Sequence, residues 1–464
     1  METIKLITYF SYLIASVLFI LGIKKLSSPK TARKGNFYSA IGMFIAVVVT
    51  LVDQGVLNYQ YVLIGIILGS IIGATVAIKV KMTAMPQMVG LLNGFGGGAS
   101  ALVAFSAYYN ILSLPDPAFN IQFSLAASLS ILIGSVTFSG SLIAFGKLQD
   151  IITGRVIKFP LQNPINILLL VIVAILLVMG ILNPENAMPF LVIAGISLVL
   201  GVLLVLPIGG ADMPVVISLL NSYSGIAAAT TGFVLNNNML IIAGSLVGAS
   251  GIILTNIMCK GMNRSLMNVV LGGWEEAGTI TTADAKKVDI KSVDSEEAAM
   301  IFDTASKVVI APGYGMAVAQ AQHAVKELMN VLESKGIDVR FAIHPVAGRM
   351  PGHMNVLLAE ADVPYDKLYA LEDINDDFTN TDIALIIGAN DVVNPAARND
   401  TNSPIYGMPI LNVDYAKTVV MNKRSMASGY AGIDNELFGY PNNLMYFGDA
   451  KDAITKLTND IKNL

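Results

Sequence analysis

The sequence predicts a membrane α-helical bundle of about nine transmembrane helices joined to an α/β, Rossmann-like domain with a doubly wound parallel sheet. Three observations support this fold class. The 464 residues are 54% hydrophobic and only 13% charged, whereas a soluble protein carries about 25% charged residues. Residues 1–264 hold 13 Lys or Arg and 6 Asp or Glu, whereas residues 265–464 hold 16 Lys or Arg and 27 Asp or Glu, so the first part is basic and the second acidic. Beyond residue 299, strand-like and helix-like stretches alternate.

The composition also excludes several classes of protein. A mean hydropathy of +0.65 excludes a disordered chain and a single soluble domain. An acidic second half argues against nucleic acid as a partner. The single cysteine, Cys259, excludes an intrachain disulfide and a cysteine metal cluster. The three histidines lack metal-ligand spacing, so we predict no metal site and expect them at the surface or in supporting roles: His323, His344 and His353.

A span needs roughly 20 apolar residues, and nine stretches qualify or come close: 4–23, 37–52, 60–78, 86–109, 124–146, 165–182, 189–207, 214–235 and 239–259. The first lacks a basic start and precedes Lys24 and Lys25, which favours a span over a cleaved signal peptide. One set of alternate loops carries all the Lys and Arg of this half except Lys5. The positive-inside rule therefore places the N-terminus outside and the residues after 260 in the cytoplasm.

The predicted spans carry amide and hydroxyl side chains, and no Lys, Arg, Glu or His near their middles: Asn93, Thr137, Ser139, Asn221, Ser222, Ser224, Thr230 and Thr231. Asp212 lies at the cytoplasmic mouth of the eighth span. Glycines at 94, 96–98, 244, 248 and 251 predict close helix packing, with Ser and Asn donating hydrogen bonds between helices. For Asn93 and Asn221, a polar path through the membrane is the other interpretation.

The remaining chain divides into two parts. Polar, acidic residues around Trp274 predict a cytoplasmic linker, 265–298, between a membrane domain, 1–264, and an α/β domain, 299–464. The α/β domain has strand-like segments at 307–311, 338–343, 383–388, 409–413, 417–421 and 444–447, and helix-like ones at 316–334 and 449–463. Buried strands separated by helices predict a parallel sheet.

A Gly-x-Gly turn, Gly313-Tyr314-Gly315, follows the first of these strands. In that position glycines let the backbone approach a diphosphate at a helix N-terminus, although a tight turn without a ligand has the same sequence. The second strand ends without the acid that holds an NAD ribose. Lys423, Arg424 and Ser425 follow another strand. Such a triplet is often plain surface, but beside this turn it favours the 2′-phosphate of NADP.

From these features alone, a redox-sensing channel or transporter with a regulatory NADP-binding domain is an alternative, and so is a membrane-anchored dehydrogenase. Longer motifs, however, resemble the beta subunit of proton-translocating nicotinamide nucleotide transhydrogenases over nearly the whole chain. The matching segments are Ala311–Gln322, His344–Ala361, Gly388–Asp391, Lys423–Ser425, Gly429–Gly432, Gly448–Lys451, Gly209–Val216 and Leu220–Gly225.

The resemblance implies reversible hydride transfer from NADH to NADP+, coupled to proton movement across a membrane, in the Si-specific/Re-specific class. NADP(H) would bind this chain and NAD(H) a partner alpha subunit, in a two-fold complex with a second beta subunit. A separate beta subunit further implies the inner membrane of a bacterium.

The resemblance also implies roles for residues. Asp391 would couple the proton state to NADP binding. The cofactor would lie among Gly313, Tyr314, Gly315, Val346, Ala347, Gly348, Arg349, Met350, Pro351, Gly388, Ala389, Asn390, Asp391, Val392, Gly407, Met408, Lys423, Arg424, Ser425, Met426, Ala427, Ser428, Gly429, Tyr430, Asp449 and Ala450. Some relatives carry a histidine in the fourth span, where this sequence has Asn93. Asparagine cannot titrate, so we expect the partner subunit to supply the titrating group, with Asn93, Asn221 and Asp212 along the proton path.

Overall fold

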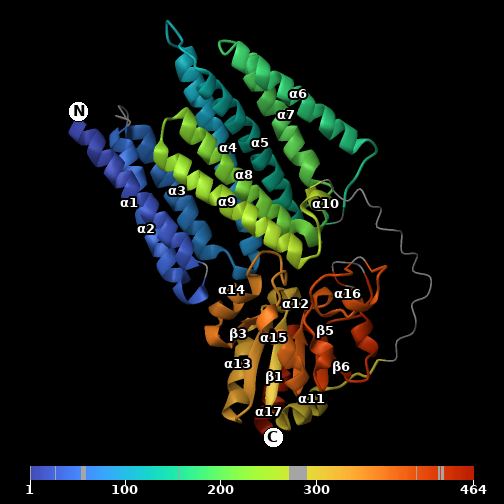
Figure 1. The fold of residues 1–464 in the computed structure, drawn as a ribbon. Helices are drawn as coiled ribbons and strands as arrows, with labels where there is room; N and C mark the ends of the chain where they lie inside the picture. The colour runs from blue at the N-terminus through green and yellow to red at the C-terminus, as the bar shows by residue number, and fades with distance from the viewer. Residues whose placement is uncertain are drawn as a thin grey trace. The chain divides into compact units, whose positions relative to one another are not determined.

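Nine helices in the described part of the computed structural model are long and apolar enough to cross a membrane (Figure 1). The structure describes residues 2–26, 28–53, 59–154, 156–270, 290–403, 405–426, 429 and 433–464. The nine helices are α1 (Glu2–Leu26), α2 (Pro29–Asp53), α3 (Tyr59–Lys79), α4 (Met85–Leu112), α5 (Ile121–Leu148), α6 (Gln162–Leu182), α7 (Met188–Val205), α8 (Met213–Val234) and α9 (Asn238–Gly261). The short apolar stretch 37–52 lies inside α2, which begins at a proline, a residue well suited to the first helical position.

The chain divides into two units, Met1–Ile208 with Val216–Thr255 and Gly209–Val215 with Asn256–Leu464. Much of the predicted linker, including Trp274, lies outside the described residues. Helices α10 (Leu266–Val270) and α11 (Ser295–Asp303) stand on either side of this gap in the description. Asp294 and Glu297 form a capping box at the start of α11, which fixes where that helix begins.

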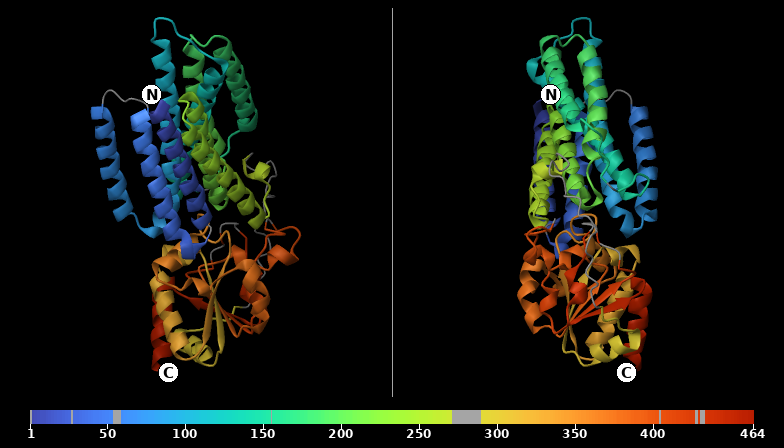
Figure 2. Two further views of the ribbon diagram at one scale, coloured as in Figure 1. Left: turned by 60° about the vertical axis from the view of Figure 1, so that its left-hand side comes forward. Right: turned by 90° about the vertical axis from the view of Figure 1, so that its right-hand side faces the viewer.

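Glycines allow the membrane helices to pack with their backbones close together. A Cβ atom on Gly97 of α4 would lie 2.9 Å from the Gly134 carbonyl oxygen of α5, and one on Gly225 of α8 would lie 2.8 Å from the Gly244 oxygen of α9. Both views in Figure 2 show helices of this unit running side by side. The prediction that the glycines serve helix packing is confirmed.

Several predicted polar side chains join neighbouring membrane helices. The Asn93 amide of α4 donates to the Ile217 carbonyl of α8 at 3.3 Å. The Ser222 hydroxyl of α8 donates to the Gly248 carbonyl of α9 at 2.7 Å. By contrast, the hydroxyls of Thr137, Ser139 and Thr230 donate to carbonyls of their own helices.

The second unit contains a six-stranded sheet in which every strand pairs parallel, in the order β3-β2-β1-β4-β5-β6. The strands are β1 (Lys307–Pro312), β2 (Asp338–Ile343), β3 (Leu368–Ala370), β4 (Ile383–Ile387), β5 (Thr418–Lys423) and β6 (Asn443–Phe447). The predicted Rossmann-like, doubly wound class is confirmed.

Two local predictions are wrong. Residues 409–413 form no strand, because the backbone there bonds to other groups: Asn375 donates to the Ile410 carbonyl and accepts from the Asn412 amide, and the Leu411 amide bonds to Val392. The predicted helix 316–334 is two helices, α12 (Tyr314–Val318) and α13 (Gln322–Ser334). They are separated near Gln320, whose φ of 52° is left-handed and interrupts a helix.

The sheet is buried on both faces. Val309 and Ala311 of β1 pack in a core with Leu371 of α15 (Leu371–Ile374) and Phe378. The alternate residues Val308 and Ile310 are also fully buried, so they face the opposite side. Among the helices of this domain, α13 contacts both α14 (His353–Glu360) and α17 (Ala450–Asn463). Within the described residues of this domain, the ends of the strands are therefore the places left for a site.

Candidate functional site

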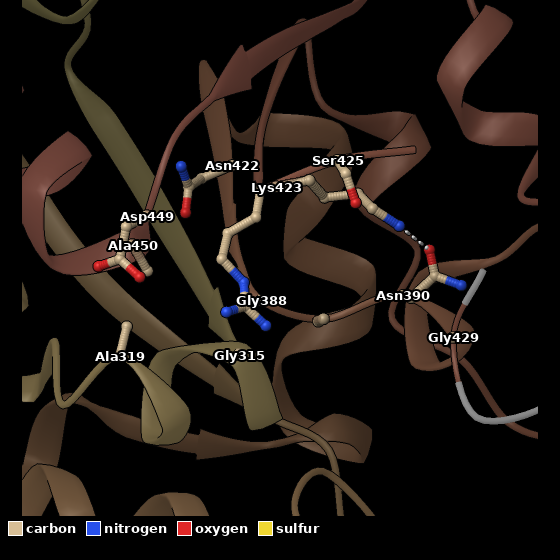
Figure 3. A pocket seen from close by; sticks show the side chains of 12 residues that line it. Gly315, Ala319, Gly388, Asn390, Asn422, Lys423, Ser425, Gly429, Asp449 and Ala450 are labelled. Carbon is tan, nitrogen blue, oxygen red and sulfur yellow. Dashed lines mark hydrogen bonds between the residues drawn. The ribbon is translucent and has the colours of Figure 1, made fainter. Parts of the chain in front are cut away.

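A pocket of about 220 Å³ opens at the carboxyl ends of β1, β4, β5 and β6 (Figure 3). It lies around the place where the strand order reverses between β1 and β4, which is where open parallel sheets bind ligands. Its lining comprises Gly315, Ala319, Gly388, Ala389, Asn390, Asn422, Lys423, Arg424, Ser425, Gly429, Asp449 and Ala450.

The floor of the pocket consists of two loops that meet backbone against backbone. The Gly313 and Gly315 amides donate to the Ile387 and Gly388 carbonyls at 2.8 and 2.9 Å. A Cβ on Gly315 would lie 2.6 Å from the Gly388 Cα, and Gly388 has a φ of 65°. The Gly-x-Gly turn therefore serves contact with the β4 loop, in addition to any approach to a ligand.

The basic end of the pocket is at the end of β5. The Lys423 ammonium donates to the Asn390 side-chain oxygen at 2.9 Å and lies 4.7 Å from the centre of the Phe438 ring. Burial lowers the pKa of Lys423, while the Asp391 carboxylate raises it. Arg424 and Ser425 are exposed beside it. A lysine held in place and an accessible arginine make this end suitable for a phosphate.

An asparagine and an aspartate follow β4. The Asn390 amide donates to Asp391 Oδ1 at 2.9 Å, and the buried Asn435 donates to the Asn390 carbonyl at 3.0 Å. Gly429 lies against this pair, because a Cβ on it would be 2.4 Å from Asp391 Oδ1 and 2.7 Å from Asn390 Nδ2. Residues from three separate segments thus fix one corner of the pocket.

The opposite wall is the start of α17. Asp449 caps this helix by accepting a hydrogen bond from the Lys451 amide at 3.1 Å. The helix N-terminus, where Asp449 and Ala450 line the pocket, contributes partial positive charge. Asn422 and Ala319 also line the pocket, although no sequence motif selected them. Asn422 is buried and donates to the Tyr446 and Gly448 carbonyls, and nothing in its local sequence marks a strand-end asparagine as part of a site.

The loop containing Val346–Pro351 is held by two histidines. His344 Nδ1 accepts the Val346 amide at 3.2 Å, and its Nε2 is 2.7 Å from the Pro409 carbonyl. His353 Nδ1 accepts the Arg349 amide at 3.1 Å. Of the two expected roles, at the surface or in support, these two histidines have the supporting one, because both are buried and bond to this loop. Burial lowers the pKa of each to about 4, so both are neutral at pH 7.

The loop also reaches the glycine turn through its arginine. The Arg349 guanidinium carbon lies 4.3 Å from the centre of the Tyr314 ring. Neither Arg349 nor Tyr314 lines the pocket. The same holds for the other predicted residues of these two segments: Gly313, Val346, Ala347, Gly348, Met350 and Pro351.

The structure places the rest of the predicted cofactor residues in three ways. Asp391 contacts the pocket's Asn390 but does not line it, and Val392 packs against the sheet core. Met408 packs in a small core with Ala397, Ile405 and Ile410, and Gly407 and Met426 are exposed outside the pocket lining. Ala427, Ser428 and Tyr430 lie outside the described residues.

The predicted proton-path residues lie in separate surroundings. Asn93 bonds to the Ile217 carbonyl, one helical turn before the partly buried Asn221. Asp212 lies in the short turn η2 (Gly210–Asp212), with Oδ1 4.0 Å from Arg264 Nε. Burial raises the pKa of Asp212, and Arg264 opposes that shift.

Comparison with known proteins agrees with this architecture. The family model described as NAD(P) transhydrogenase beta subunit matches residues 8–460. The chain is 51% identical to the NAD(P) transhydrogenase subunit beta of Rhodospirillum rubrum, over 96% of this chain and 97% of that protein. The same protein of a named strain of that organism gives the same identity and coverage. The chain therefore belongs to the NAD(P) transhydrogenase beta subunit family.

Proposed function

We propose that this chain binds NADP(H) and works with a partner alpha subunit that binds NAD(H), in reversible hydride transfer from NADH to NADP+ coupled to proton movement. The observation that carries the proposal is the pocket at the strand ends, with Lys423 and Arg424 beside a helix N-terminus. Its chemistry fits a dinucleotide with an additional phosphate. Membership of the transhydrogenase beta family supports the reaction.

The residues present fit NADP(H) at three points. Lys423, Arg424 and Ser425 would hold the 2′-phosphate through charge-assisted and hydroxyl hydrogen bonds. Gly315 and Gly388 would leave room for the sugar–phosphate chain of the cofactor at the floor of the pocket, since neither residue carries a side chain. Arg349, stacked on Tyr314, would hold the diphosphate or ribose side.

The proposed chemistry requires little from side chains. When both cofactors are bound, hydride passes directly between two nicotinamide rings. This chain's task is to hold its ring at contact distance from the partner's and to exclude water. No general base is required in the pocket. Asp391 would act on the coupling instead, by making NADP(H) affinity depend on its protonation.

We propose a proton path through the predicted membrane domain, 1–264, along Asn93, Asn221 and Asp212. The Asn93 bond to α8 brings one carboxamide within a helical turn of the other. Because Asn93 cannot titrate, we propose that the partner subunit supplies the group that titrates in place of the histidine of some relatives. Asp212 immediately precedes the first residue of α8, and burial favours its protonated form.

We also propose an arrangement in the cell. The basic loops support an N-terminus outside and a cytoplasmic domain 299–464, and a separate beta subunit supports the inner membrane of a bacterium. The domain boundaries would be 1–264, 265–298 and 299–464. The full assembly would contain an alpha subunit and a second beta subunit.

Hydride exchange in the co-expressed complex tests the proposal. Purified alpha and beta subunits, mixed with NADH and an NADP+ analogue of distinct absorbance, should reduce the analogue. Beta subunit alone should show no exchange. A complex that binds both nucleotides without exchange would contradict the proposal and favour a redox-sensing channel or transporter.

A further inference from the structure

We propose that Asn390 determines the selectivity of this site for a 2′-phosphate, by holding Lys423 with an uncharged acceptor and separating its ammonium from the Asp391 carboxylate. This inference rests on the proposed function and deepens it. Asn390 lies between the two charged groups, as Figure 3 shows for its bond to Lys423.

The orientation of the Asn390 side chain follows from its two neighbours. An ammonium can only donate hydrogen bonds, and an ionised carboxylate can only accept them. The carboxamide oxygen must therefore face Lys423, at 2.9 Å, and its nitrogen must face Asp391, at 2.9 Å. No exchange of the amide oxygen and nitrogen would satisfy both neighbours, so the chemistry fixes the assignment.

The backbone of Asn390 is fixed as well. Buried Asn435 donates to the Asn390 carbonyl at 3.0 Å and also caps the turn η7 (Glu436–Gly439). That turn carries Phe438, whose ring lies 4.7 Å from the Lys423 ammonium. Two groups from one corner of the pocket, a carboxamide and a ring face, thus position the ammonium, and neither carries a net charge.

An uncharged partner matters because of what the lysine has to bind. A phosphate monoester carries nearly two negative charges at pH 7. If Asp391 paired with Lys423 directly, the phosphate would have to displace a carboxylate before binding. The bond to Asn390 uses one of the three donors of the ammonium and leaves its charge uncompensated by that contact. NAD+ has no 2′-phosphate, so this arrangement affects NADP+ binding alone.

Substitution of Asn390 by aspartate gives the sharpest test, since it keeps the shape and adds a charge. The probes are NADP+ and NAD+, titrated calorimetrically into the full-length chain in detergent. For N390D, we expect NADP+ to bind at least about tenfold more weakly, while the NAD+ affinity changes by less than about threefold. N390A removes the hydrogen bond to Lys423 without adding a charge, so its loss of NADP+ affinity should be smaller than that of N390D. N330D adds the same charge at an exposed position of α13 and should match the wild type.

The K423A background shows whether the effect passes through Lys423. Adding N390D to K423A should change NADP+ affinity by less than about twofold, because the group that it neutralises is gone. An equal loss for NADP+ and NAD+, a loss in N390A as large as in N390D, or a full N390D effect without Lys423 would each overturn the inference.

Two further outcomes separate the inference from the function on which it rests. If the wild type prefers NADP+ but N390D retains that preference, the inference fails and the proposed function stands. If the wild type shows no preference, both fail. If N390D does not fold, N390A tests the inference instead. N390A must then weaken the binding of NADP+ but not of NAD+, and this effect must disappear in the K423A background. Any other result overturns the inference.

Discussion

The guanidinium of Arg349 lies over the ring of Tyr314, with the guanidinium carbon 4.3 Å from the ring centre. This contact joins the loop after β2 to the glycine turn after β1. It orients the proposed diphosphate-binding arginine over a ring face, which attracts a cation without neutralising its charge.

Replacing Tyr314 by leucine should therefore weaken NADP+ binding. A cation–π contact contributes about 0.5 to 2 kcal/mol, which corresponds to about a 2- to 30-fold change in Kd. Phenylalanine keeps the ring face, so Y314F should bind within about twofold of the wild type. Calorimetric titration of the purified chain measures both variants, and equal losses in the two would show that the ring contact does not position Arg349.

The two histidines beneath the same loop predict a stability that falls in acid. Burial lowers the pKa of His344 and His353 to about 4, below the usual 6.5. Both are neutral when folded, and the unfolded chain takes up protons as the pH falls below about 6.5. The free energy of unfolding should then fall by about 1.4 kcal/mol per pH unit for each histidine until the pH nears 4.

His353→Asn isolates one of these contributions. The Asn side-chain oxygen can replace Nδ1 as the acceptor for the Arg349 amide, but it does not titrate. Denaturant unfolding of wild type and H353N, measured from pH 7.5 to 4.5, should show a shallower acid dependence in the variant. An unchanged slope would mean that His353 does not resist protonation in the folded state.

Gly429 predicts a steric effect at the Asn390–Asp391 corner. A Cβ there would come within 2.4 Å of Asp391 Oδ1 and 2.7 Å of Asn390 Nδ2. Gly429→Ala should displace this pair and weaken NADP+ binding, with little change in thermal stability. Gly154→Ala, which adds the same methyl group at a position where a Cβ would meet nothing within 4 Å, serves as the control and should leave NADP+ binding unchanged. NADP+ affinity in G429A equal to that of the wild type would show that the corner tolerates movement.

The membrane unit supplies a separate prediction. Asn221→Leu removes a polar group from α8 next to the turn that Asn93 contacts. We expect proton pumping by the complex in proteoliposomes to be lost, and hydride exchange in detergent to continue. Asn221→Ser keeps a polar group and should retain part of the pumping. Normal pumping by N221L would remove Asn221 from the path.

The larger features were predictable from the sequence because each has a local signal. Spans show as apolar length, and five of the six strands show as buried apolar runs. The short edge strand β3 gives no such run, since only Leu368–Ala370 pair. Residues 409–413 look like a strand, but side chains distant in sequence, such as Asn375, take their backbone bonds.

The pocket was predictable only where a motif marked it. Lys423 and Arg424 could be selected as a basic pair beside a glycine turn. The roles of Asn422, His344 and His353 could not be inferred, because each depends on contacts with segments that the fold brings together. The bond between Lys423 and Asn390 links residues 33 positions apart, which no local pattern reveals.

The central claim is that this chain holds NADP(H) through the 2′-phosphate at the end of β5. Equilibrium titration of the purified full-length chain with NADP+ and NAD+ tests it most directly, in the wild type and in the K423A/R424A variant. We predict tighter binding of NADP+ by the wild type. In the variant, the binding free energy of NADP+ should weaken by about 3 kcal/mol or more, which raises its Kd about a hundredfold, while the Kd of NAD+ changes little. A wild type that prefers NAD+, or a variant with unaltered NADP+ affinity, would contradict the account.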